Sequence, residues 1–233
     1  MLVLEQVTKH YRLRREEVVG LKNVDLTIEN GEFVALVGPS GSGKSTLLLV
    51  LGSMMSPTAG RVLMDGTSVY DLSVTRRTEL RRAKMGFVFQ TFNLVPYLTA
   101  TQNVQLPLAL AGAPISAQVR RASELLDRVG LTDRMDHKPC ELSIGQQQRV
   151  ALARTLANDP EIILADEPTG NLDPETRTQI LEFFKEFNQE GKTVVLVTHD
   201  PAVAEMAHRN VRIVEGRITH AKIAGQESPA CVA

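Results

Sequence analysis

Four short runs of apolar residues occur along the chain without polar alternation, at 33–37, 86–89, 162–165 and 193–197. Such runs are typical of strands buried on both faces, as in a parallel sheet covered by helices. In the first 30 residues, single apolar residues stand among polar ones instead. That segment is therefore predicted to form short antiparallel strands.

Helical periodicity is clear in three segments, at 118–129, 143–157 and 173–188. The second segment stops before Pro160, and the third opens with Asp173 followed by Pro174, which is a typical helix start. Helices interspersed with buried strands predict an α/β protein with a mostly parallel core and an N-terminal antiparallel β portion.

Composition narrows the possible functions. The chain has 233 residues, with 26 Lys and Arg against 27 Asp and Glu, for a net charge of −1. This balance gives no electrostatic reason to expect a nucleic-acid partner. Cys140 and Cys231 lie far apart, which argues against a disulfide scaffold or a zinc site. No apolar stretch exceeds the length of 47–51, which is far shorter than the roughly 18 to 20 residues of a membrane span.

A phosphate-binding loop is predicted at residues 38–45, which match G-x-x-x-x-G-K-[ST] at every fixed position. The match follows a buried strand and opens a helix, a context that disfavours a chance glycine-rich turn. Backbone N–H groups would face the phosphates, Lys44 would approach the β- and γ-phosphates, and Ser45 would bind Mg²⁺. The residues expected to contact nucleotide here are Gly38, Ser40, Gly41, Ser42, Gly43, Lys44, Ser45 and Thr46.

Polar residues also follow the other buried runs. Asp166 and Glu167 end the third run, where Asp166 would bind Mg²⁺ through water and Glu167 would act as general base. The alternative is a strand that ends in acidic residues without a catalytic role. Gln90 follows the second run and His199 the fourth. Carboxyl ends of parallel strands are where ligands bind, so both are candidates, although a structural role is the alternative for each.

Residues 142–146, Leu-Ser-Ile-Gly-Gln, open the helix that precedes the acidic run. With this segment in place, the chain resembles the ATP-binding-cassette ATPases that drive ABC transporters. The resemblance covers about residues 1–222, with residues 223–233 left as a flexible tail. Its ordered motifs are Tyr11, the phosphate loop, Gln90, residues 142–146, Asp166 with Glu167, residues 171–173, and His199.

The resemblance implies further assignments. Tyr11 would stack on adenine, Gln90 would contact the metal and the attacking water, and His199 would contact the γ-phosphate. The fold would be a P-loop core with a helical sub-domain inserted at about 91–143. The family signature is L-S-G-G-Q, and Ile144 departs from it. Ser143, Gly145 and Gln146 are retained as nucleotide-binding residues, although Ser143 and Gln146 could form only a structural capping box.

Residues 87–96, 103–108, 145–151 and 164–173 resemble the branch that serves lipoprotein release, macrolide efflux and cell division, except that Gln102 stands where Glu is usual. Apolar residues after Gln90 could form a socket for the permease or belong to the sub-domain core; they are Phe92, Leu94, Val95 and Leu98.

The resemblance therefore implies an ATPase that hydrolyses ATP with Mg²⁺. Two copies would pack head to tail and drive a separate transmembrane permease from the inner, cytoplasmic face of the membrane. The alternative is a cell-division-type ATPase that regulates a membrane partner without transport. A soluble ABC ATPase acting on DNA or ribosomes usually has coiled-coil insertions or two cassettes, which this chain lacks.

Overall fold

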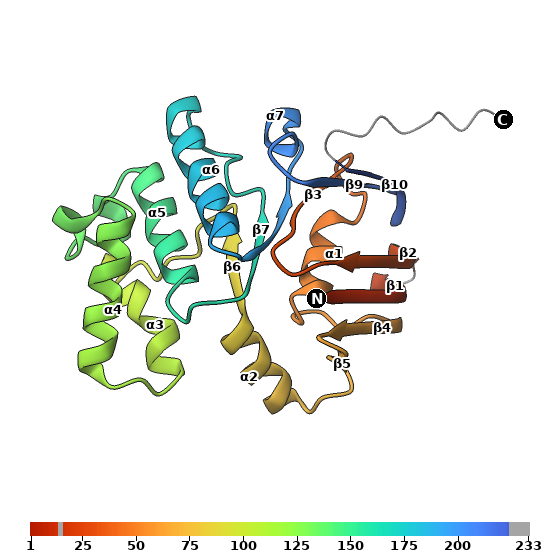
Figure 1. Ribbon diagram of the computed structural model, residues 1–233, viewed down its shortest axis with the longest axis horizontal. Coiled ribbons are helices and arrows are strands. Elements are labelled where there is room, and N and C mark those ends of the chain that lie inside the picture. Colours follow the sequence, from red (N-terminus) through yellow and green to blue (C-terminus); the bar gives the residue numbers. More distant parts are fainter. Residues whose placement is uncertain (14–15, 224–233) are drawn as a thin grey trace. The chain divides into compact units, whose positions relative to one another are not determined.

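The computed structural model describes residues 1–13 and 16–223 (Figure 1). The chain divides into two compact units, one made of residues 1–77 with the segment from Thr193 onward, and the other of residues 78–192. The predicted tail at 223–233 lies outside the described residues except for residue 223, where the last strand ends.

The first unit contains a four-stranded antiparallel sheet in the order β2-β1-β4-β5 (Figure 1). Its strands are β1 (Leu2–Leu13), β2 (Glu16–Ile28), β4 (Ala59–Met64) and β5 (Thr67–Ser68). The predicted antiparallel pairing is confirmed. The prediction that these strands are short is wrong, because β1 and β2 run for 12 and 13 residues. Register shifts along their pairing absorb the irregular polar pattern without ending the strands.

Four further strands of the first unit follow the order β10-β9-β3-β8. They are β3 (Phe33–Val37), β8 (Thr193–Val197), β9 (Arg209–Val214) and β10 (Arg217–Ile223). β3 is parallel to both β8 and β9, whereas β10 returns antiparallel to β9. Helix α1 (Lys44–Leu51) follows β3, and the short helix α7 (Pro201–Ala204) follows β8. β3 and β8 coincide with two predicted buried runs.

The second unit pairs β6 (Met85–Phe89) in parallel with β7 (Ile162–Asp166). Around them lie α3 (Ala100–Leu110), α4 (Ile115–Arg128), α5 (Ile144–Thr155) and α6 (Pro174–Gln189) (Figure 1). Two short 3-10 helices, Thr132–Arg134 and Pro139–Glu141, precede α5. Helix α2 (Val74–Lys84) begins in the first unit and ends in the second.

Helices α4, α5 and α6 agree with the three predicted helical segments to within a few residues, whereas α3 was not predicted. Ser143 is the N-cap of α5 and Asp173 the N-cap of α6, as their sequence context indicates. The inner face of α6 is anchored by Phe184 and Phe187, both fully buried. Across residues 1–13 and 16–223, no helix combines the length and the apolar character that crossing a membrane requires.

Candidate functional site

The predicted phosphate loop connects β3 to α1 within the first unit. Gly38 and Gly43 have φ values of 150° and 108°, which side-chain-bearing residues rarely adopt. A Cβ atom on Gly38 would lie 2.1 Å from the Ile213 carbonyl oxygen, and one on Gly43 would lie 2.4 Å from that of Gly20. Backbone packing therefore requires glycine at both ends of the loop.

Lys44 is held inside this loop. The side chain is only 7% exposed, and its Nζ donates hydrogen bonds of 2.9 Å to the carbonyl oxygens of Gly38 and Pro39. Ser42 is also buried, and its Oγ has no hydrogen-bond partner among the described residues. A cation and an unpartnered hydroxyl in a loop at a helix N-terminus fit a phosphate group.

Tyr11 lies beside the helix that follows the loop. Its hydroxyl is 2.9 Å from Thr46 Oγ1 and donates to Met55 Sδ at 3.0 Å. Gly20 leaves room for the ring, since a Cβ there would lie 2.7 Å from a Tyr11 ring carbon. The fold thus brings two predicted nucleotide contacts, Tyr11 and Thr46, into direct contact.

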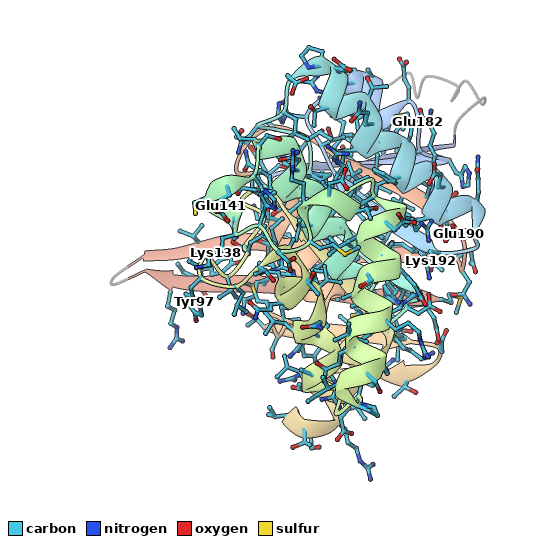
Figure 2. All side chains as sticks on the ribbon, turned by 90° about the vertical axis from the view of Figure 1, so that its left-hand side faces the viewer. Tyr97, Lys138, Glu141, Glu182, Glu190 and Lys192 are labelled. Atoms are coloured by element: carbon cyan, nitrogen blue, oxygen red, sulfur yellow. The ribbon has the colours of Figure 1, made fainter. Side chains whose placement is uncertain are left out.

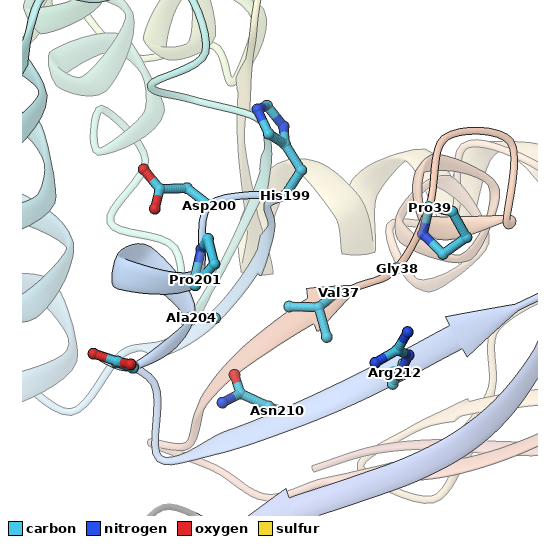
Figure 3. A pocket seen from close by; sticks show the side chains of 10 residues that line it. Val37, Gly38, Pro39, His199, Asp200, Pro201, Ala204, Asn210 and Arg212 are labelled. Atoms are coloured by element: carbon cyan, nitrogen blue, oxygen red, sulfur yellow. The ribbon is translucent and has the colours of Figure 1, made fainter.

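His199 reaches the same end of the sheet as the phosphate loop. Leu36 of β3 pairs with Val197 of β8 in parallel, so both strands deliver their next residues to one edge. Gly38, Pro39, His199 and Arg212 are among the residues that line a cavity of about 670 Å³ there. Figure 3 shows Val37 and Gly38 at the end of one strand and His199 after the end of another. The predicted proximity of His199 to the loop is therefore present within the first unit.

The second unit joins Gln90 to the acidic strand end. Phe89 pairs with Asp166 across β6 and β7, so Gln90 and Glu167 leave neighbouring strands at the same level. The Gln90 Nε2 atom lies 3.1 Å from the position that a Cβ of Gly170 would occupy. Glu167 itself has a φ of 46°, and its carbonyl oxygen accepts a 3.1 Å hydrogen bond from the Gly170 N–H. Gln90 thus lies against the turn that carries Glu167.

The first turn of α5 holds the retained signature residues. Ser143 Oγ accepts from the Gln146 N–H at 3.3 Å, and Gln146 Oε1 accepts from the Ser143 N–H at 3.0 Å, which forms the expected capping box. A Cβ on Gly145 would lie 2.5 Å from the Thr176 methyl carbon of α6, so this glycine also serves packing. Ile144 is 54% exposed, and its departure from the family pattern therefore lies on the surface of this unit.

Two polar side chains shape the loop after Gln90: Arg154, which no predicted motif includes, and Asn103, which begins the 103–108 segment of the resemblance. Arg154 donates 2.6 Å hydrogen bonds to the carbonyl oxygens of Phe92 and Asn93, and burial lowers the pKa of its guanidinium. Asn103 is fully buried, and its amide binds backbone groups of Val95, Leu98 and Thr99. A buried asparagine in an apolar helical segment was the available signal for this loop anchor.

The same loop contains the apolar residues for which a permease socket and the sub-domain core are the two alternatives. Its four apolar residues are all half-buried, and they are Phe92, Leu94, Val95 and Leu98. Tyr97, in the same loop, is 74% exposed (Figure 2). Phe92 and Asn93 have φ values of 55° and 50°, so the loop keeps an unfavourable backbone conformation that Arg154 stabilises. The four apolar side chains are thus partly accessible, in a loop that Arg154 and Asn103 hold in place through hydrogen bonds to its backbone.

Three features together define a P-loop nucleotide-binding protein. The buried strand β3 leads into a glycine-rich loop, helix α1 begins at Lys44, and strand β7 leads to an acidic pair. Comparison with known families agrees, since the model described as "ABC transporter" matches residues 21–170. The chain belongs to the ABC transporter family, as one of its ATP-binding ATPase cassettes.

Several relatives are similar over nearly the whole chain. An uncharacterized ABC transporter ATP-binding protein of Thermotoga maritima is 50% identical over 218 residues, covering 94% of this chain and 93% of the relative. A macrolide export ATP-binding/permease protein of Syntrophobacter fumaroxidans is 48% identical over 94% of this chain, which spans 31% of that longer protein.

Solved structures give the same result for the fold. The ATP-binding cassette MJ0796 has been solved as a dimer in a post-hydrolysis state bound to ADP and phosphate, and it matches with a TM-score of 0.91 and 45% identity. The match covers 97% of this chain and all of that one. A relative named MJ0796, from Methanocaldococcus jannaschii, is 50% identical over 223 residues, or 94% of this chain and 95% of the relative. The expected α/β cassette fold and family are confirmed.

Proposed function

We propose that this chain is the ATP-hydrolysing motor of an efflux or lipoprotein-release transporter and acts on a separate membrane permease. The chain matches relatives named as ATP-binding proteins over almost their whole length, and it matches about a third of relatives whose names add a permease. This similarity supports a role of these residues as an ATP-binding component. The single observation that carries the ATPase assignment is the Lys44-bearing loop at the end of β3.

ATP binding would replace contacts that the loop now makes with itself. Lys44 would exchange the Gly38 and Pro39 carbonyl oxygens for β- and γ-phosphate oxygens, and the Ser42 hydroxyl would gain an acceptor. Ser40, Gly41 and Gly43 would contribute backbone N–H groups, and Tyr11 would pack on adenine beside Thr46. Oxygen atoms of Ser45, Gln90 and Asp166 are those that would hold Mg²⁺, which neutralises phosphate charge when bound.

Hydrolysis requires a base beside the attacking water. Glu167 would accept a proton from that water as the water attacks the γ-phosphorus, while the Gln90 amide keeps the water oriented. The bond from the γ-phosphorus to the β–γ bridging oxygen would break, so that ADP leaves and phosphate remains. His199 would donate a hydrogen bond to the γ-phosphate oxygen on which charge accumulates. The position of Gln90 against the Glu167 turn supports this division of tasks.

Two copies are proposed to enclose each nucleotide, as the dimeric MJ0796 structures suggest. Ser143, Gly145 and Gln146 would then contact the γ-phosphate held by the partner. Ser143 is exposed at the positive end of the 12-residue helix α5, which suits an anion. The chain would work at the inner face of the membrane, where the loop after Gln90 contacts the permease.

Two variants test the composite site. Glu167→Gln retains size and hydrogen bonding but removes the base, so ATP should bind, persist and hold a dimer in sizing chromatography. Ser143→Arg should bind ATP at its own loop yet remain monomeric, because a bulky cation would occupy the partner's γ-phosphate position. A Glu167→Gln variant that stays monomeric at high concentration with saturating ATP and Mg²⁺ would contradict the proposed dimer for the isolated chain.

A further inference from the structure

A glutamine in the middle of α5 contacts the segment that carries the proposed base. Gln148 is fully buried, and its Nε2 donates a 2.6 Å hydrogen bond to the carbonyl oxygen of Pro168. Pro168 directly follows Glu167 and is itself buried. The bond joins residues 20 positions apart in the chain, both within the second unit.

Packing volume alone does not explain a glutamine at this position. The Gln148 Oε1 atom is also buried, and it has no hydrogen-bond partner among the described residues. Burying an amide oxygen without a partner is unfavourable. Methionine has nearly the same length and volume and would fill the site without that cost, but it would leave the Pro168 carbonyl oxygen without this donor. The Nε2 bond to Pro168 is therefore the contact that distinguishes glutamine from an apolar residue here.

The turn that this bond holds is strained. Glu167 has a φ of 46°, a left-handed conformation that is unfavourable for a residue with a side chain and persists only where neighbouring structure imposes it. The Gly170 N–H closes the turn onto the Glu167 carbonyl oxygen at 3.1 Å. Gln148 binds the residue between these two contacts, and so supports the turn from the protein interior.

The same helix also holds the strand that leads to Gln90. Thr155, at the end of α5, donates a 2.7 Å hydrogen bond from its hydroxyl to the Phe87 carbonyl oxygen of β6. A Cβ on Gly86 would lie 2.5 Å from the Thr155 methyl carbon, so the helix approaches this strand closely. Helix α5 is thus attached both to the Gln90 strand and to the Glu167 turn.

We propose that Gln148 is a positioning residue for ATP hydrolysis, which fixes the Glu167 carboxylate by tying the Pro168 carbonyl to α5. The inference rests on the proposed role of Glu167 as the base. Gln148 would touch neither nucleotide nor water, and ATP binding would not depend on it. Its loss should therefore lower the rate of the chemical step and leave affinity for nucleotide unchanged.

The test compares Gln148→Met with Gln118→Met in the full chain. Gln118 is a matched control, because its Nε2 also donates to a backbone carbonyl, that of Ala113, at 2.7 Å. For Gln148→Met we expect kcat to fall about 10- to 100-fold, as misplacement of a reacting group by about 1 Å does, with KM for ATP changed less than about twofold. Gln118→Met should retain the parental kcat.

A second measurement separates positioning from folding. Gln148→Met combined with Glu167→Gln should still form the ATP-dependent dimer in sizing chromatography. Gln148→Met should unfold in one cooperative thermal transition, at a midpoint lowered by the loss of the hydrogen bond to Pro168. If Gln148→Met does not fold, Gln148→Leu can replace it. Leucine also removes the hydrogen-bond donor and fills the site with a different apolar side chain, so the same results are expected.

Three outcomes would overturn the proposal. The first is a parental kcat in a folded Gln148 variant, and the second is a rise in KM that accounts for the whole loss of kcat/KM. The third is that the double variant fails to dimerise although Glu167→Gln alone forms the dimer. If Glu167→Gln alone fails to dimerise, the composite-site proposal fails instead, and the kcat and KM comparison still decides the role of Gln148.

Discussion

Removing the loop cation is the most direct test of the nucleotide site. Lys44→Ala deletes an ammonium that makes two 2.9 Å hydrogen bonds to loop carbonyl oxygens. A hydrogen bond from a charged donor contributes about 1.5 to 3 kcal/mol, and desolvation of the buried ammonium offsets a large part of the sum. We expect a net loss of about 2 kcal/mol, or about 4 to 8 °C in the unfolding midpoint of a chain this size.

Addition of ATP should enlarge the difference in unfolding midpoint between the parent and Lys44→Ala. ATP at 100 times its dissociation constant stabilises the parent by about 2.7 kcal/mol. Lys44→Ala should gain much less, because the cation that would face the β- and γ-phosphates is gone. Thermal unfolding with and without Mg-ATP, together with a phosphate-release assay, measures both effects.

Lys44→Met serves as the control for packing. Its side chain fills the buried space that the lysine stem occupies. Part of the free energy of unfolding without nucleotide should therefore return, but ATP should still not raise the unfolding midpoint as it does in the parent. A Lys44→Ala protein that hydrolyses ATP at the parental rate would refute the assignment of this loop. An unfolding midpoint that rises with ATP as much as in the parent would show that Lys44 does not contact the phosphates.

Asn103→Ala should lower the free energy of unfolding by about 3 kcal/mol, because it removes four part-buried hydrogen bonds to backbone groups of the loop after Gln90. A loss below about 1 kcal/mol in urea denaturation would contradict this. Hydrogen bonds from the Thr176 side chain and backbone lower the pKa of Asp173 below its ordinary value of 3.8. Asp173 therefore stabilises the fold above that pH, and the gap in unfolding midpoint between parent and Asp173→Ala should shrink as pH falls below about 4; a gap independent of pH would argue against the charge. Finally, the chain should fractionate with membranes only when its permease is co-expressed, whereas tight binding to protein-free liposomes would contradict docking through a partner.

The sequence by itself determined the features that depend on neighbouring residues. Glycine spacing predicted the phosphate loop, because eight neighbouring residues carry the whole pattern. The contacts that require glycine at 38 and 43 come instead from Ile213 and Gly20, which are distant in the sequence. The capping box of Ser143 with Gln146 is likewise local, since both contacts span three positions. The buried strands at 33–37 and 193–197 were also predictable, because burial on both faces removes polar alternation.

The hairpin of β9 and β10 was not anticipated. Polar residues interrupt the apolar pattern of β9, so the local sequence does not indicate a strand. The segment becomes a strand because it pairs with β3 and β10. The same holds for the length of β1 and β2, which their long mutual pairing decides rather than the local pattern.

Tertiary structure alone decided which of the local features meet. Strand register placed Gln90 against Gly170, and helix packing brought Gly145 against Thr176. The bond from Gln148 to Pro168 joins two segments whose local patterns are those of an ordinary helix and an ordinary turn. Contacts of this kind depend on the relative placement of whole elements within a unit, and that placement follows from the sum of many packing interactions rather than from any residue's immediate neighbours.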